Sequence, residues 1–341
     1  MSIRRAWELI GPALLVVGVA LVGSVTSGSM EFQFRVVLVT ASLVVALHVF
    51  VGNSGVISFG HVSFVALGAM SAGLATTPVE IKSRSMSELF PVLADLQLSN
   101  LESLGLAAVL GGAYAFVVGV PIMRLSGLQA GIATFAVIII TNNVFRNWDR
   151  IGSAARALGP IPETTGFVQA TVGLLLAIVV AYFYQATRHA RMLRAAREDP
   201  AAAQSSGVNI YRQRLLAFTI SGAMAGLSGG LLAHLFGSIT TEVVFLDLTF
   251  ITLAMLVVGG IGSLWGAVVG ALSIAGLNSF LAEAEREVTL VGLDLDLPSG
   301  TRLVVLGIIM AAVLLFRPSG LTSGRELSWP LARRGRTAPG G

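Results

Sequence analysis

Ten apolar segments recur along the chain, and this pattern constrains its fold more than any other feature. Lipid offers no hydrogen-bonding partner to a peptide backbone, so an apolar segment in a membrane satisfies its backbone groups as a helix. A straight helical span needs about 20 predominantly apolar residues. The pattern therefore predicts an all-α polytopic membrane protein with about 10 transmembrane or partly re-entrant helices. The segments lie at 9–25, 36–52, 58–77, 103–123, 129–146, 167–187, 214–236, 246–258, 263–281 and 302–316.

The composition agrees with this prediction. Only 12% of the residues are charged and 55% are hydrophobic, whereas soluble domains carry about 25% charged residues. The 39 glycines suit membrane helices, because small residues let helices approach closely. Absence of cysteine excludes a disulfide framework and a thiolate metal site. The basic start and apolar run at the N-terminus have the outline of a signal peptide, but the length of the run favours an uncleaved first helix.

Basic residues are distributed by side of the membrane rather than along one soluble face, so nucleic acid is not an expected partner. If the N-terminus is cytoplasmic, ten spans place the C-terminus there too, and 14 of the 22 basic residues then lie inside. An excess of arginine and lysine in cytoplasmic loops is the usual orientation signal. We therefore expect one transmembrane domain over 1–316, with a cytoplasmic loop over 188–213, and an arginine-rich cytoplasmic tail over 317–341.

The polar loop over 188–213 contains the signals of one short helix. Asp199 can accept backbone hydrogen bonds as the N-cap, Pro200 suits the first helical position, and Gly207 can end the helix in the left-handed conformation. A helix over 200–206 is about 10 Å long and too short to cross a bilayer. Taken alone, the segment fits two interpretations. It is either a plain positive-inside loop that sets orientation, or a docking element whose small alanine face enters a groove on a partner protein.

The predicted outer loop over 282–301 combines carboxylates with an alternating stretch, VTLVGLDLDL. Alternation of this kind is typical of a short hairpin or an interfacial segment. The carboxylates lack the ligand order and the glycine of an EF-hand, so no metal site is expected.

Four blocks of sequence carry a resemblance to a known family. The stretch RAAREDPAAAQSSGVNIYRQRLLAFTISGAMAGLSGGLLA resembles the cytoplasmic loop and following helix of permease subunits of branched-chain amino acid (hydrophobic amino acid uptake) ABC importers. GNSGVISFGHVSFVALGAMSAG resembles that family's Gly-x-x-Gly-x-x-Ser-x-Gly-His element. TFAVIIITNNVFRNWDRIG and VVGGIGSLWGAVVGA are similar to its middle span and its late glycine-rich helix start. The blocks follow the family's order and cover most of 36–281.

The resemblance implies the transmembrane permease subunit of an ABC importer in the bacterial cytoplasmic (inner) membrane. In that family, a short coupling helix docks on the ATPase subunit. The implied partners are a second homologous permease subunit in a heterodimer, two ABC ATPase subunits, an extracytoplasmic substrate-binding protein and the lipid bilayer. The residues expected to couple this chain to the ATPase are Arg194, Glu198, Asp199, Ala201, Ala202 and Gly207.

Two departures from the family pattern leave the substrate open. Family members often carry an acidic residue shortly after the position of Thr134 and Phe135, where this chain has Val137, Ile138 and Ile139. The glycine-rich stretch usual after the NWD element is replaced by GSAARALGPIP. A branched-chain or other hydrophobic amino acid is the first expectation, and urea, amides, carboxylates and sugars stay open.

A nucleotide-binding motif is not visible. A Walker A loop requires spaced glycines before a lysine, and the only lysine, Lys82, lies in VEIKSRSM without them. We therefore expect no enzymatic activity and no cofactor in this chain, with ATP and Mg²⁺ bound by the partner ATPase. The alternative from another class, an autonomous secondary transporter or channel, would require ion-coupling carboxylates or a charged filter within the spans, and neither is visible.

Polar residues inside the apolar segments are candidates for a translocation pathway, because such groups usually face protein or a water-filled cavity. For His61 and Trp265, simple packing within the bundle is the stronger interpretation. The candidates are Asn53, Ser58, His61, Thr134, Asn142, Asn143, Trp265 and Asn278. Spaced glycines in 52–70 and 259–274 indicate helix breaks and a possible internal repeat. The glycines expected at these breaks are Gly52, Gly55, Gly60, Gly259, Gly260 and Gly262.

Overall fold

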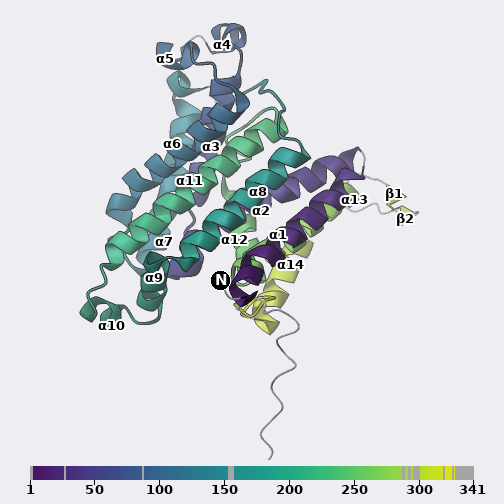
Figure 1. Ribbon diagram of the computed structural model, residues 1–341. Coiled ribbons are helices and arrows are strands. Elements are labelled where there is room, and N and C mark those ends of the chain that lie inside the picture. Colours follow the sequence, from purple (N-terminus) through teal and green to yellow (C-terminus); the bar gives the residue numbers. More distant parts are fainter. Residues whose placement is uncertain are drawn as a thin grey trace, which may run out of the picture.

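The computed structural model describes residues 3–26, 28–86, 88–152, 157–285, 289–290, 293–294, 300–317, 319–324 and 326. The described part is helical apart from one two-stranded antiparallel hairpin and its connecting loops (Figure 1). In chain order the elements are α1 (Ile3–Ser24), α2 (Ser29–Ser54), α3 (His61–Thr76), α4 (Val79–Ser85), α5 (Pro91–Ala94), α6 (Asn100–Ile122), α7 (Gly127–Asn147), the 3₁₀ turn η1 (Asp149–Ile151), α8 (Phe167–Ala186), α9 (Arg188–Glu198), α10 (Pro200–Ser205), α11 (Ile210–Phe236), α12 (Leu246–Gly259), α13 (Leu264–Ala284), β1 (Thr289–Leu290), β2 (Leu293–Asp294) and α14 (Thr301–Phe316).

Each of the ten predicted apolar segments forms a helix, which confirms the all-α membrane class. Among the described residues, seven helices are long and apolar enough to cross a membrane alone: α1, α2, α6, α7, α8, α11 and α13. The α3–α4 pair, bent by 111°, adds an eighth span or a re-entrant segment. At 14 residues, α12 measures about 21 Å and is shorter than the roughly 30 Å hydrocarbon layer. The count of ten is therefore approximate.

Helices α2 and α11 form the centre of the bundle. Every residue of α2 from Val37 to Ser54 is buried, and α11 packs against α2, α3 and α6. Glycines allow this close approach: a Cβ on Gly226 of α11 would overlap the carbonyl oxygen of Ala107 in α6, and one on Gly68 of α3 would overlap the carbonyl oxygen of Gly226. Small residues at crossings are the usual means by which membrane helices pack without a hydrophobic driving force.

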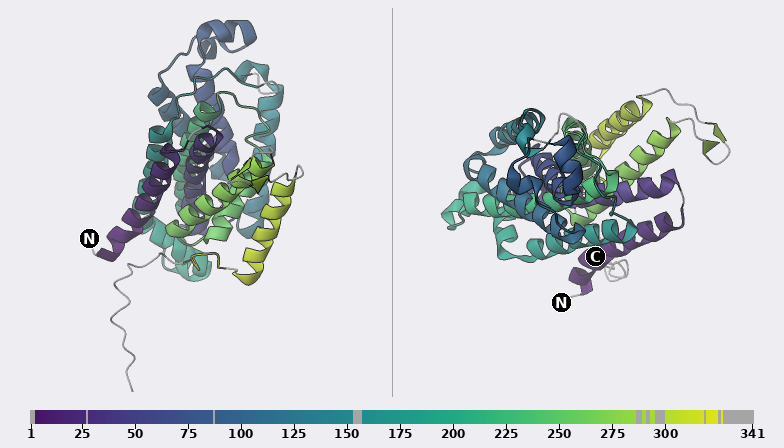
Figure 2. Two further views of the ribbon diagram at one scale, coloured as in Figure 1. Left: turned by 90° about the vertical axis from the view of Figure 1, so that its right-hand side faces the viewer. Right: turned by 90° about the horizontal axis from the view of Figure 1, so that it is seen from above.

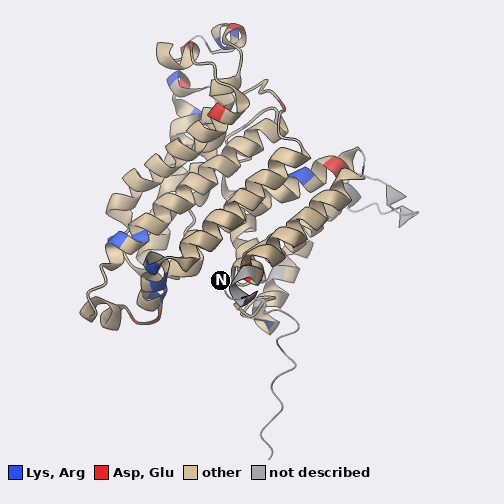
Figure 3. Ribbon diagram, in the orientation of Figure 1, with Lys and Arg blue, Asp and Glu red and all other residues tan. Residues whose placement is uncertain are grey.

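The bundle has two distinct ends (Figure 1 and Figure 2). Helices α4 and α5 lie at one of them, which we call the α4 end. Helices α9 and α10 lie at the other, the α10 end, together with the last turn of α2 and the tail segment, which is formed by residues 319–324 and 326. Lysine and arginine gather around α9 and the start of α11 at the α10 end, and a second group lies at the α4 end (Figure 3).

Two glycine-rich breaks meet at the α10 end. Gly55 ends α2 with φ +70°, and Gly260 ends α12 with φ +115°, values that glycine adopts without the strain of a side chain. The breaks are in contact, because His48 of α2 lies with its Nδ1 3.0 Å from the carbonyl oxygen of Ile261. Both sequences thus run from a helix through a break into a second helix, and the wider internal repeat stays a prediction.

The first residues of the predicted tail pack on the transmembrane domain rather than leaving it. Leu321 donates its backbone N–H to the carbonyl oxygen of Val258 at 2.8 Å, and Thr322 donates to that of Gly259. These bonds occupy carbonyl groups that the end of α12 leaves without helical partners. Residues 327–341, which hold the arginine-rich part of the tail, lie outside the described residues. The predicted hairpin is present as β1 and β2, with Thr289 opposite Asp294.

Candidate functional site

Helix α10 begins as its sequence predicts. Asp199 is the N-cap, and its Oδ1 accepts the backbone N–H groups of Ala201 at 2.9 Å and Ala202 at 3.0 Å. Pro200 occupies the first helical turn, where a missing N–H costs nothing. Two of the donors that a helix start leaves without partners are thereby satisfied within a six-residue helix.

The end of α10 is fixed by a Schellman motif. Gly207 has φ +80°, its N–H donates to Gln204, and the N–H of Val208 donates to the carbonyl oxygen of Ala203 at 3.0 Å. A small core of Ala196, Ala203 and Ile210, with Val208 against it, lies beneath the turn. This apolar contact commonly accompanies the motif, so α10 is a rigid element with defined ends.

The outer face of α10 is small and exposed. Ala201 and Ala202 are both exposed, whereas Ala203 faces the small core. Glu198 precedes the helix with 83% of its side chain exposed and lies 4.0 Å from Arg197. Exposed alanines let another backbone approach closely, so this face has the shape of a docking surface.

Two arginines of α9 tie this unit to the end of α2. Arg194 donates from Nη1 to Oδ1 of Asn53 at 2.7 Å and from Nη2 to the carbonyl oxygen of Gln185 at 3.1 Å. Arg197 donates to the carbonyl oxygen of Gly52 at 2.9 Å. Cationic side chains at a helix C-terminus satisfy its last carbonyls and favour its dipole. These hydrogen bonds connect α9, and through it α10, to the last turn of α2.

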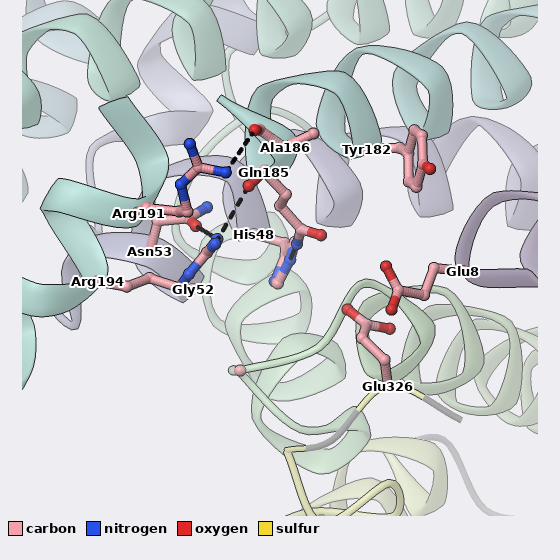
Figure 4. Close-up of a pocket in the computed structure, with 11 residues that line it drawn as sticks. Glu8, His48, Gly52, Asn53, Tyr182, Gln185, Ala186, Arg191, Arg194 and Glu326 are labelled. Atoms are coloured by element: carbon pink, nitrogen blue, oxygen red, sulfur yellow. Dashed lines mark hydrogen bonds between the residues drawn. The ribbon is translucent and has the colours of Figure 1, made fainter. Parts of the chain in front are cut away.

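A cavity of about 330 Å³ opens beside this link (Figure 4). His48 lies in its wall with Nδ1 near the carbonyl oxygen of Ile261 and Nε2 2.6 Å from the amide nitrogen of Gln185. This arrangement fits a neutral imidazole that donates from Nδ1 and accepts at Nε2, a tautomer assigned from the hydrogen bonds. The charged residues of the wall are Glu8, Arg191, Arg194 and Glu326.

Glu326 is a functional candidate that the sequence analysis missed. Its carboxylate accepts the backbone N–H groups of Leu264 at 2.7 Å and Trp265 at 3.2 Å, so a residue of the tail caps the start of α13. Burial raises the pKa of the Glu326 carboxyl, and these two donors act in the opposite direction. The available signal was that this glutamate is the only acidic residue after position 316.

His61 and Ser58 lie in the packed core. The His61 ring has Nδ1 2.8 Å from Oγ of Ser58 and Nε2 2.5 Å from Oγ of Ser221, and 2% of the residue is exposed. Phe64 and Phe218 pack edge-on against the ring. The position is that of a histidine satisfied by its neighbours, with both ring nitrogens engaged.

Thr134 and Asn142 lie along the contact between α7 and α3. Thr134 accepts the backbone N–H of Phe59 at 3.1 Å, and Asn142 donates to the carbonyl oxygen of Thr241 at 3.2 Å. A small void adjoins Asn142, and Ser63 of α3 faces it with a buried hydroxyl that has no hydrogen-bond partner. Asn142 thus borders a small void between helices, and Asn53 lines the larger cavity at the α10 end.

The structure separates the remaining candidates. Asn143 is exposed and donates to its own helix at Ile139, and Asn278 is half-buried in α13. Trp265 is buried against Trp7 of α1, with ring centroids 6.0 Å apart. Asn53 belongs to the α2–α9 link described above. The predicted pathway residues therefore do not form one continuous lining within this chain.

The six predicted break glycines all lie at helix ends or close contacts. Besides Gly55 and Gly260, which have positive φ, four permit close approach: Gly52 to His48, Gly60 to Thr134, Gly259 to Gly266 and Gly262 to Gly324. Their role as hinges stays a prediction.

The fold and the site define a multi-pass membrane protein that presents a short, rigid helix at one end of its bundle. The chain belongs to the family described as the branched-chain amino acid transport system permease component, whose model matches residues 29–314.

Relatives of two types match this chain, and those of the LivM type align with most of it. The high-affinity branched-chain amino acid transport system permease protein LivM of Salmonella typhimurium is 26% identical over 346 aligned positions, which cover 91% of this chain and 73% of that protein. The probable permease protein LivM of Methanocaldococcus jannaschii is 23% identical, covering 82% of this chain and 89% of its own. A second type, the probable branched-chain amino acid transport permease protein LivH of the same organism, is 32% identical over 49% of this chain and 50% of its own.

Proposed function

We propose that this chain forms one half of the translocation pathway of an ABC importer for a branched-chain or similar hydrophobic amino acid. The family assignment supports the substrate class, and similarity to both LivM and LivH proteins supports pairing with a second, homologous permease subunit. In this proposal the protein lies in the bacterial inner membrane with its α10 end in the cytoplasm.

The observation that carries the proposal is the construction of α10. Its ends are fixed by Asp199 and Gly207, its exposed face is made of Ala201 and Ala202, and it is bonded through α9 to the last turn of α2. A plain loop that only sets orientation needs none of these features. A helix that receives force from a partner needs all of them, because the force must reach the spans without being lost in a flexible loop.

In this mechanism a separate subunit binds ATP and Mg²⁺ and hydrolyses the ATP, and this chain would take no part in the catalysis. Closure of two ATPase subunits would move α10, and Arg194 and Arg197 would pass the movement to α2. The breaks at Gly55 and Gly260 adjoin that helix end and provide a place where the spans can change angle. Coupling of this kind requires two arrangements of the bundle that ATP and substrate each bias. A soluble binding protein would deliver substrate at the α4 end.

The test uses the complex reconstituted in liposomes with its ATPase, its second permease and its binding protein. Ala202→Arg places a long charged side chain on the exposed face of α10, and Ala195→Arg, at an exposed position on α9, is the matched control. We expect Ala202→Arg to reduce substrate-stimulated ATP hydrolysis and uptake at least tenfold and Ala195→Arg to leave both nearly unchanged. Normal coupled uptake by assembled Ala202→Arg complex would refute the docking role.

The substrate class is tested in the same vesicles with a panel of radiolabelled solutes. Uptake of leucine, isoleucine or valine above that of urea, short amides, carboxylates and sugars is the expected result. Uptake of one of those other solutes in preference to the amino acids would contradict the proposed substrate while leaving the coupling result intact.

A further inference from the structure

The cavity at the α10 end places unlike charges on opposite walls. Arg191 and Arg194 enter from α9, while Glu8 of α1 and Glu326 of the tail segment lie together on the facing side (Figure 4). Three parts of the chain that are far apart in sequence thus contribute charged groups to one space. The α2–α9 link involves only part of the Arg194 guanidinium, and Arg191, Glu8 and Glu326 take no part in it.

Neither arginine of this cavity forms an ion pair with Glu326 across it, because among the described residues the ion pairs found for the arginines of α9 are limited to Arg197 with Glu198. The charges nevertheless act on each other: burial lowers the pKa of Arg194, and the carboxylates of Glu326 and Glu8 act to raise it. Arg194 and Glu326 influence each other without pairing directly, and a half-buried charge of this kind is stabilised further when a group of opposite sign contacts it.

Donors remain available on the positive wall. Arg194 carries five N–H groups and uses one to Asn53 and one to the carbonyl oxygen of Gln185. Arg191 makes a single long contact of 3.4 Å to the carbonyl oxygen of Ala186. On the negative wall, the two oxygens of Glu326 accept three hydrogen bonds, which leaves part of their capacity of about four free.

We propose that this cavity is a binding site for a small zwitterion, with the anionic group on Arg191 and Arg194 and the ammonium group on Glu8 and Glu326. A volume of about 330 Å³ lies at the lower end of the roughly 300–1,000 Å³ typical of small-molecule sites. A free amino acid has this chemistry, and so does the headgroup of phosphatidylethanolamine. The site lies beside the coupling link and away from the void between α3 and α7, and its occupancy does not depend on the proposed transport function.

Occupancy of this cavity would act directly on the α2–α9 link, the hydrogen bonds of Arg194 and Arg197 to the last turn of α2. A ligand held by Arg191 and Arg194 joins α9 to α1 and to the tail segment that caps α13. The bound ligand would therefore restrict movement of α9 and α10 relative to the breaks at 55–60 and 260–263. Binding here is consequently expected to alter how easily α10 moves relative to the spans.

Matched probes test the zwitterion requirement on the purified full-length chain in nanodiscs of phosphatidylglycerol, a lipid without an ammonium group. L-leucine carries both charges, 3-methylbutylamine lacks the carboxylate and 4-methylpentanoate lacks the ammonium. Calorimetric titration is expected to show leucine binding at least about tenfold more tightly than either half-probe, because each lost ionic hydrogen bond is a substantial part of so small a ligand's affinity. Equal binding of a half-probe would overturn the proposal.

The lipid source is tested in a second arm, in nanodiscs that also contain phosphatidylethanolamine. Native mass spectrometry then measures which lipid stays bound to the protein after release. Retention of phosphatidylethanolamine over phosphatidylglycerol, with no leucine binding, identifies the occupant as a headgroup. Absence of both leucine binding and selective lipid retention would refute the site.

Variants locate the binding. Glu8→Gln and Arg191→Gln remove one charge from each wall and are expected to weaken binding of the occupant at least about tenfold. Glu80→Gln in α4 and Arg188→Gln in α9 are exposed and outside the cavity, and they should bind as the unaltered protein does. Binding that is unchanged in both cavity variants would place the ligand elsewhere and overturn the proposal. If either variant fails to fold, the probe series on the unaltered protein still decides the charge requirement.

Discussion

Replacement of Gly226 by alanine tests whether close helix packing holds this bundle together. The new methyl group would overlap the carbonyl oxygen of Ala107 and lie 3.0 Å from Cα of Gly111, both backbone atoms of α6. Since ordinary contact begins at 3.4 Å and backbone cannot rotate away, α6 and α11 would have to separate by roughly 1 Å, an overpacking that typically costs ~1–3 kcal/mol. Alanine regains up to about 1 kcal/mol through helix propensity. From the middle of that range we expect a net loss near 1 kcal/mol, or about a fivefold shift toward the unfolded state.

The control for this variant lies on the neighbouring helix. Gly105 of α6 has nothing within 4 Å of a Cβ position, so Gly105→Ala should be neutral or stabilising by up to about 1 kcal/mol. Both free energies of unfolding are measured by titrating mixed micelles with sodium dodecyl sulfate and following helicity. If Gly226→Ala and Gly105→Ala agree within about 0.5 kcal/mol, the argument that glycine is required for the α6–α11 approach is wrong.

Two further predictions concern the α10 end. Asp199→Ala removes the acceptor of two N–H groups of α10 and should destabilise that helix by about 1 kcal/mol. Hydrogen exchange in 201–206 should then be roughly fivefold faster, whereas Asp199→Ser should retain most of the protection. Exchange in the alanine variant equal to that of the unaltered protein would contradict the role of Asp199 as the cap. Burial raises the pKa of Glu326. The contribution of this residue to the free energy of unfolding is therefore fully present below the ordinary pKa of glutamate and is lost as pH rises through the raised pKa. Glu326→Gln should remove this pH dependence. The free energy of unfolding of the variant should therefore rise relative to that of the unaltered protein as pH increases. A difference between the two that stays constant with pH would contradict the raised pKa of Glu326.

The tail segment gives the α10 end a property that neither helix alone supplies. Glu326 caps α13 and also faces the cavity that Arg194 lines, so one carboxylate connects the late break with the α9 link. Movement of α10, docking of the tail and occupancy of the cavity are therefore expected to influence one another. Ala202 and Arg191 allow the first and the third to be perturbed separately, whereas Glu326 takes part in both the docking of the tail and the cavity.

The local features of α10 could be predicted because they depend on neighbours in sequence. Asp199, Pro200 and Gly207 specify a start and an end through backbone hydrogen bonds that span at most five residues, and tertiary contacts did not override them. The ten apolar segments are a similar case, since the need to satisfy backbone groups in lipid makes a helix of each. The boundaries were less well predicted where polar residues continue a helix beyond its apolar part: α2 begins at Ser29 rather than near 36.

Partners that are distant in sequence could not be predicted in this way. For His61 the sequence favoured packing in the bundle but named no distant partner, and the contact with Ser221, 160 residues away, is what places it in the core. The use of Asn53 by Arg194 and the capping of α13 by Glu326 depend in the same way on how the helices are arranged.

By itself, the sequence determined that this is a helical membrane protein with a short, capped helix in a polar loop, because hydrophobic length and capping chemistry act locally. Only the tertiary structure decided what that helix is attached to and which charges surround the cavity beside it. The physical reason is that small-residue crossings such as Gly226 against Ala107 set the distances between spans, and no periodicity in the chain encodes which glycine will face which carbonyl. The coupling link and the proposed zwitterion site are consequences of that packing.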